Sequence, residues 1–69
     1  MRPWTDEEYR ILFRNRNLSA EQLSELLPGR SIGAIEAVLG GLDQYLNGRR
    51  NANLLSRRGL AIAEEEFPR

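Results

Sequence analysis

Two short stretches of this chain carry complete signals for the start of an α-helix. In PWTDEEYRILF, the Thr5 side chain can accept from a backbone N–H of the first turn, while the Thr5 N–H can donate to Glu8. Ser19 and Gln22 repeat this capping box in LSAEQL. In both stretches an apolar residue precedes the cap and another follows it, which allows a hydrophobic staple. We therefore expect two helices that begin close together in the sequence.

The apolar pattern predicts how far these helices extend and where a third one lies. The first two are predicted over residues 6–15 and 20–27, each with one apolar face. The Pro-Gly pair at 28–29 ends the second helix, because proline disfavours helical geometry in the residue before it and glycine tolerates positive φ. Ser31 then caps a third helix, whose apolar residues recur every three or four positions as far as Leu46.

Composition limits the classes of function. The 69 residues are enough for one domain with a small core. Arginines without lysine balance the carboxylates to a formal charge of zero, so net charge does not favour a polyanionic partner. The chain has neither cysteine nor histidine, which excludes disulfides, a thiol nucleophile, an imidazole base and an ordinary zinc site. We expect no enzyme activity, no cofactor and no metal.

The chain shows no targeting or membrane segment. MRPWTDEEYR leads directly into polar residues, and no apolar run approaches the ~18 residues of a membrane helix. We therefore expect no membrane contact, and a cytoplasmic location in a bacterial or phage-infected cell or a nuclear one in a eukaryote. A short chain that begins at Met also suggests a complete small regulator.

The motifs WTDEEYRIL and LSELLPGRSIGAI follow one another at a spacing found in a known family. Over residues 3–46 the chain resembles the Myb/SANT-like, homeodomain-like helix-turn-helix domains, in which a Leu-Pro-Gly-Arg-Ser turn opens the third helix. Of the three spaced tryptophans that the family often has, only Trp4 is present. The resemblance implies an all-α, three-helix helix-turn-helix bundle over residues 1–47. Residues 48–69 then form an arginine-bearing extension, either an arm or a short fourth helix.

The resemblance also implies which side chains would read DNA bases. They would stand on the third helix at Gly33, Glu36, Ala37 and Gly40. Two of these positions have no side chain, alanine can touch only a thymine methyl, and glutamate can accept from a cytosine amine. Direct readout of sequence from this helix is therefore expected to be weak.

The start of the third helix offers a phosphate contact that needs no base reading. Free N–H groups at a helix N-terminus attract phosphate, and the residues there are Ser31 and Gly33, with Arg30 beside them. Arg30 has an equally favoured alternative, an ion pair with Glu7 or Glu8 across the bundle.

The remaining positive charge is concentrated after the third helix. NGRRNANLLSRRG holds four arginines and no acid: Arg49, Arg50, Arg57 and Arg58. Such a segment can lie along phosphates or enter a minor groove, as the N-terminal arms of homeodomains do. A solvated tail is the alternative, and the acids at 64–66 can fold back to neutralise these arginines.

Two functions from different classes follow as hypotheses. The first is a small DNA-binding protein, a transcriptional or phage-type regulator of double-stranded DNA that contacts phosphates through the PGRS turn and the later arginines. The second is a protein-interaction module that uses the glycine and alanine face of the third helix, where another backbone can approach closely. A homodimer is compatible with both.

Overall fold

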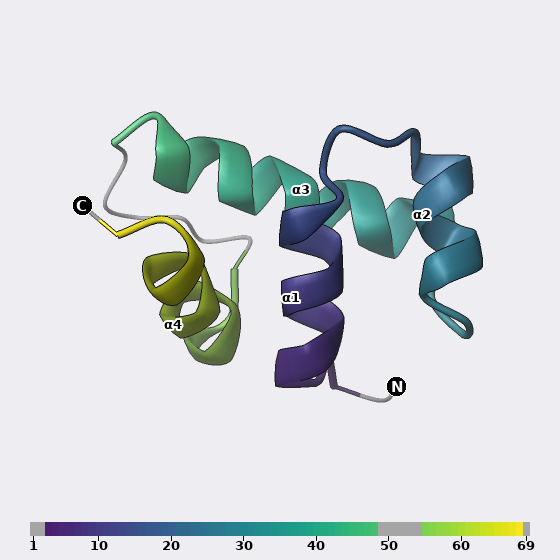
Figure 1. Cartoon of the computed structure of the whole chain (residues 1–69), viewed down its shortest axis with the longest axis horizontal. Helices are drawn as coiled ribbons and strands as arrows, with labels where there is room; N and C mark the ends of the chain where they lie inside the picture. Colours follow the sequence, from purple (N-terminus) through teal and green to yellow (C-terminus); the bar gives the residue numbers. More distant parts are fainter. Residues whose placement is uncertain (1–2, 49–54, 69) are drawn as a thin grey trace.

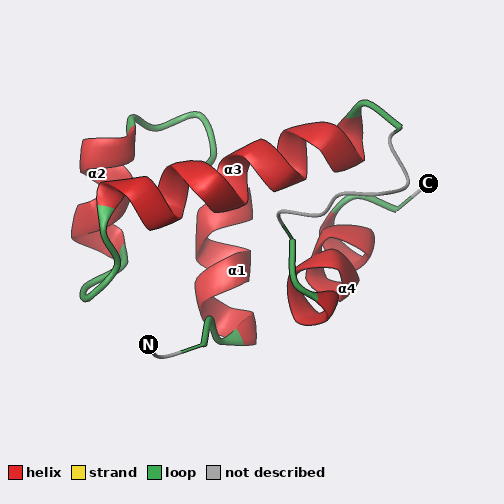
Figure 2. Ribbon diagram, turned by 180° about the vertical axis from the view of Figure 1, so that it is seen from behind, coloured by secondary structure: helices red, strands yellow, loops and turns green. Residues whose placement is uncertain are grey.

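The computed structural model describes residues 3–48 and 55–68 and contains four helices (Figure 1). These are α1 (Asp6–Arg14), α2 (Ala20–Leu26), α3 (Ile32–Leu46) and α4 (Arg57–Glu66). Within the described ranges no strand is present, so the predicted all-α class is confirmed. The longest helix, α3, runs across the others, with α2 near its N-terminal end and α4 toward its C-terminal end (Figures 1 and 2).

Both predicted capping boxes are present. The Glu8 N–H donates to the Thr5 hydroxyl over 3.1 Å, and the Thr5 N–H donates to the Glu8 carboxylate over 3.0 Å. Ser19 and Gln22 make the same reciprocal pair at 3.2 and 3.1 Å. The Trp4 ring stacks on Tyr9 with centroids 5.4 Å apart, in the positions of a hydrophobic staple. Local sequence therefore fixes where α1 and α2 begin.

The ends of α2 and α3 depend on two glycines in the left-handed conformation. Gly29 has a φ of 86° after α2, and Gly48 has a φ of 83° after α3, a region that residues with a Cβ rarely adopt. Between them, Ser31 caps α3 by accepting from the Ala34 N–H over 3.1 Å. The turn and the third helix thus form as the sequence predicted.

The core joins all four helices. Its buried residues are Tyr9, Leu12, Phe13, Leu23, Leu27, Ile35, Val38, Leu42, Tyr45, Leu55, Ile62 and Ala63. Because Ile62 and Ala63 belong to α4, part of the C-terminal extension is a helix packed into the same core. The extension was predicted to be either an arm or a short fourth helix, and residues 57–66 form the helix.

Helix α4 approaches α1 closely at its first turn. Ser56 caps α4 by accepting from the Gly59 N–H, and its hydroxyl is hydrogen-bonded to the Tyr9 hydroxyl at 2.7 Å. A Cβ placed on Gly59 would lie 3.0 Å from two atoms of the Tyr9 ring. At the far end, Tyr45 donates to the Phe67 carbonyl over 2.9 Å. Glycine has a low helix propensity, but at position 59 the absence of a side chain lets α4 lie this close to α1.

The surroundings of Gly33 and Gly59 predict opposite effects of the same substitution. A Cβ at Gly33 meets nothing within 4 Å, so Gly33→Ala should stabilise the fold by up to about 1 kcal/mol through helix propensity. Gly59→Ala should instead destabilise it, because overpacking against the hydrogen-bonded Tyr9 ring costs about 1–3 kcal/mol. Thermal unfolding followed by circular dichroism measures both, and a higher Tm for both variants would contradict the close contact.

Candidate functional site

Arg30, in the turn between α2 and α3, holds this turn against the start of α1. Its guanidinium donates to both carboxylate oxygens of Glu8, over 2.9 and 2.7 Å, and to the Pro3 carbonyl over 2.8 Å. It also lies over the Trp4 ring, 4.9 Å from the centroid, and the side chain is only 6% exposed. The ion pair with Glu8, one of the two roles expected for Arg30, is confirmed. A phosphate contact would compete with these bonds.

The Arg30 guanidinium shifts the acid–base behaviour of its partner. Its hydrogen bonds lower the pKa of Glu8 to about 2, against an opposing effect of burial, and the Thr5 N–H adds to the lowering. The same carboxylate raises the pKa of Arg30. Glu8 and Arg30 therefore remain a charged pair at neutral pH.

The positions expected to read DNA lie on one outward side of α3, which we call the small face: Gly33, Glu36, Ala37 and Gly40. Gly33, Glu36 and Ala37 are exposed and Gly40 is half-buried, and the cap residue Ser31 before them is exposed as well. Space next to Gly33 is open. Since the opposite side of α3 is in the core, the small face is open to a partner from Gly33 to Ala37.

The charged residues of α2 and α3 are all acidic. Helix α3 contains no arginine or lysine, and its charged residues are Glu36 and Asp43. Helix α2 adds Glu21 and Glu25, both exposed. The cation of the intervening turn is Arg30, which is paired with Glu8. The small face therefore offers an acidic surface, where a DNA-reading helix would offer cations to phosphate.

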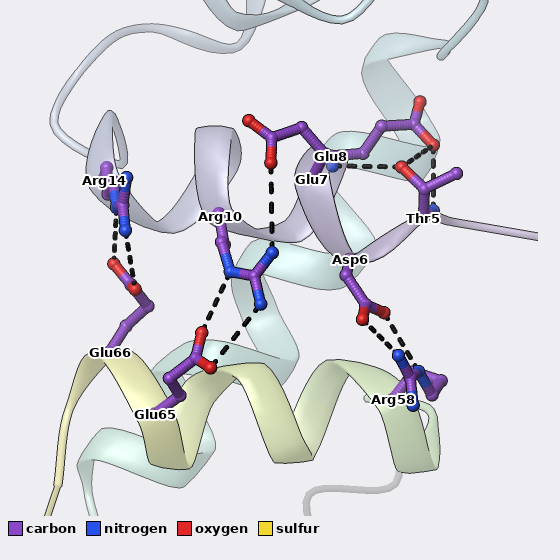
Figure 3. A network of polar contacts seen from close by, with 9 residues as sticks. All are labelled: Thr5, Asp6, Glu7, Glu8, Arg10, Arg14, Arg58, Glu65 and Glu66. Atoms are coloured by element: carbon purple, nitrogen blue, oxygen red, sulfur yellow. Dashed lines mark hydrogen bonds and ion pairs between the residues drawn. The ribbon is translucent and has the colours of Figure 1, made fainter.

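Three arginines join α1 to α4 in the order of the sequence. Arg58 donates to Asp6, Arg10 to Glu65 over 2.9 Å and Arg14 to Glu66 over 2.7 Å (Figure 3). The two helices consequently run side by side in the same direction. Glu66 has a lowered pKa and Arg14 and Arg10 raised ones, each mainly because of the hydrogen bond to its partner.

These pairs correct the expectation for the C-terminal acids. Glu65 and Glu66 pair with Arg10 and Arg14 of α1, and not with Arg57 or Arg58, because α4 packs parallel to α1. Of the expected phosphate contacts in this segment, Arg58 is paired with Asp6, whereas Arg57 is exposed and forms no ion pair with a described residue. Arg49 and Arg50 lie outside the described residues.

A hollow beside α3 was not predicted from the sequence. Its volume is about 260 Å³, and the residues around it are Arg16, Asn17, Leu39, Leu42, Asp43 and Leu46. The loop between α1 and α2 forms one side and α3 the other. No local pattern links a loop to a helix more than twenty residues later, so only the fold brings them together. We call it the α3 hollow.

Comparison with known proteins does not assign a family: no family model, curated protein or solved structure matches this chain. The likeness of its motifs to the Myb/SANT-like domains stays a prediction. In the part of the chain that the structure describes, no three acidic residues gather as a metal site would require. Among the same residues, no helix has the length and apolar character needed to cross a bilayer.

The Glu8–Arg30 pair predicts a pH-dependent contribution to stability. Because the folded-state pKa of Glu8 lies below its ordinary 4.5, the contribution is present above that value and is lost as the pH falls toward 2. Glu8→Gln keeps a capping residue but removes the charge. We expect the difference in unfolding free energy between the wild type and Glu8→Gln to narrow by about 1–2 kcal/mol between pH 7 and 3, after allowance for solvent screening.

Urea unfolding at a series of pH values measures this difference. Glu7→Gln is the matched control, since Glu7 is an exposed neighbour whose contact with Arg10 is 3.9 Å long. A pH-independent difference between the wild type and Glu8→Gln would show that the ion pair does not carry the effect.

Proposed function

We propose that this protein is a protein-interaction module with a Myb/SANT-like helix-turn-helix arrangement over residues 1–47, and that the small face of α3 binds its partner. The observation that carries this proposal is that Gly33, Glu36 and Ala37 are exposed on a helix that has no arginine or lysine of its own. Protein partners accept such a surface, because interface centres are poor in charge and small residues allow close approach.

The turn between α2 and α3 supports the helix-turn-helix part of this proposal. Two helices joined by a short turn with a glycine at positive φ are typical of that motif. Burial of Ile35, Val38 and Leu42 turns the opposite side of α3 outward, where a binding helix needs it. SANT-type domains of the family that the motifs resemble include protein-binding modules, which agrees with an acidic binding helix.

DNA binding through the arginine segment is the second candidate. Arg57 favours it, since this exposed cation at the start of α4 has no acidic partner among the described residues. Such a protein would be a small transcriptional or phage-type regulator that contacts phosphates of double-stranded DNA without reading bases through α3. The acids on α2 and α3 oppose this candidate, because phosphate repels them.

A single added side chain on the small face tests the first function. Gly33→Arg places a large side chain in open space and should leave the fold intact while preventing the partner from approaching. Ala61→Arg, on the exposed side of α4, adds the same charge elsewhere and serves as the control. In affinity purification from cells of the source organism, a protein retained by the wild type and by Ala61→Arg should be lost with Gly33→Arg. Equal retention by all three would reject the small face as the binding surface.

A duplex titration separates the two candidates. With a labelled mixed-sequence duplex at about 50 mM salt, a protein-interaction module should give no change in fluorescence anisotropy. Binding that weakens steeply by about 200 mM salt and is reduced by Arg57→Ala would select the DNA candidate. Arg14→Ala is the control, because that arginine is paired with Glu66 and its removal changes net charge equally.

A further inference from the structure

A line of large apolar residues follows one edge of α3, next to the small face. Ile32 and Leu46 are 40% and 45% exposed, and Leu39 between them is half-buried. The three are spaced by seven residues, nearly two helical turns, so they stand above one another along the helix. We call this line the α3 seam. It has the spacing of one of the two contact positions in a coiled-coil heptad, while the residues at the other position, Ile35 and Leu42, are buried in the core of the bundle.

The α3 hollow lies against the C-terminal half of this seam. Leu39, Leu42 and Leu46 give it an apolar floor, and Arg16 and Asp43 are among the polar residues around it. At about 260 Å³ it is smaller than the ~300–1,000 Å³ of small-molecule pockets. A single large apolar side chain from a partner suits this volume and this lining better than a separate ligand.

Charge beside the seam indicates what kind of helix fits there. Glu36 follows Ile32 by four residues and Asp43 follows Leu39 by four, so the carboxylates form a parallel acidic line next to the seam. Neither carboxylate forms an ion pair with a described residue. In coiled coils, charges at such flanking positions decide which partner is accepted. The acidic flank therefore selects a partner helix with lysine or arginine facing it.

The same charges disfavour a second copy of this chain on the seam. If two α3 helices packed antiparallel about a two-fold axis, the acidic flank of one copy would face the acidic flank of the other. Like charges in that position are repulsive. Helix α3 has no lysine or arginine to offer in exchange.

We propose that the α3 seam is the docking line for an amphipathic α-helix of another protein, with apolar residues at heptad spacing and lysine or arginine on the flank that meets Glu36 and Asp43. One apolar side chain of this helix enters the α3 hollow. The proposal rests on the protein-binding function proposed above and names the chemistry of the partner.

A designed peptide tests this proposal without the natural partner. The probe is a fluorescein-labelled peptide of three heptads with leucine at the contact positions and lysine on the flanks, titrated with the full chain and followed by anisotropy. We expect saturable binding that Leu46→Asp weakens by at least about tenfold. Leu26→Asp is the matched control, since Leu26 is also 45% exposed but lies on α2, and it should bind like the wild type. Circular dichroism verifies that both variants are folded.

The charge of the probe is tested in the same assay. The same peptide with glutamate in place of lysine should not bind, and Asp43→Lys should weaken binding of the lysine peptide, because each change places like charges opposite one another. An equal loss in Leu26→Asp and Leu46→Asp, or binding of both peptides alike, would overturn the proposal.

Two further outcomes separate this proposal from the proposed function. If the natural partner is lost with Gly33→Arg but the lysine peptide does not bind, the seam proposal is wrong and the small face stands. Sedimentation of the wild type as a dimer that Leu46→Asp dissociates would place a second copy on the seam and would also overturn the proposal.

Discussion

The guanidinium of Arg30 joins three groups from the N-terminal segment: the Glu8 carboxylate, the Pro3 carbonyl and the Trp4 ring. Arg30 stands directly before the cap residue of α3, so these bonds fix the direction in which α3 leaves the turn. Glu8 in turn closes the capping box of α1. One carboxylate thus satisfies the start of the first helix and holds the turn that leads into the third.

Net neutrality conceals an uneven distribution of charge. The arginines of α1 and the acids of α4 neutralise one another along the line where these helices meet. Helices α2 and α3 are left with acids that no described cation pairs, while the segment 49–58 has arginines and no acid. A chain of zero formal charge therefore presents an acidic helix to a partner of α3, with Arg16 beside its C-terminal half, and this local charge, not the total, decides which partner fits.

Local signals in the sequence predicted most of the helical structure. Capping at Thr5, Ser19 and Ser31 and the stop at Pro-Gly depend only on residues a few positions apart, so α1, α2 and α3 lie where they were expected. The sequence predicted either an arm or a fourth helix for the extension, because Gly59 disfavours a helix, and that glycine is explained by the Tyr9 ring about fifty residues away.

The parts of the candidate site that depend on residues close in the sequence were predictable as well. Helical periodicity gave the outward side of α3, and the seven-residue spacing of Ile32, Leu39 and Leu46 was readable from the sequence. The α3 hollow and the choice of Glu8 as the partner of Arg30 required knowledge of which loops and helices meet.

The parallel contact between α1 and α4 has a consequence for how the chain acquires its structure. Helix α1 precedes the other described helices and α4 follows them, so the side of α1 that carries Tyr9 stays uncovered until residues near 56 have been synthesised. A small helical bundle normally folds through contacts between neighbouring segments, and closing a chain over such a separation slows this process. The contact between α1 and α4 is therefore expected to form after those between neighbouring helices, and until it forms the Tyr9 side of α1 is accessible to other apolar surfaces.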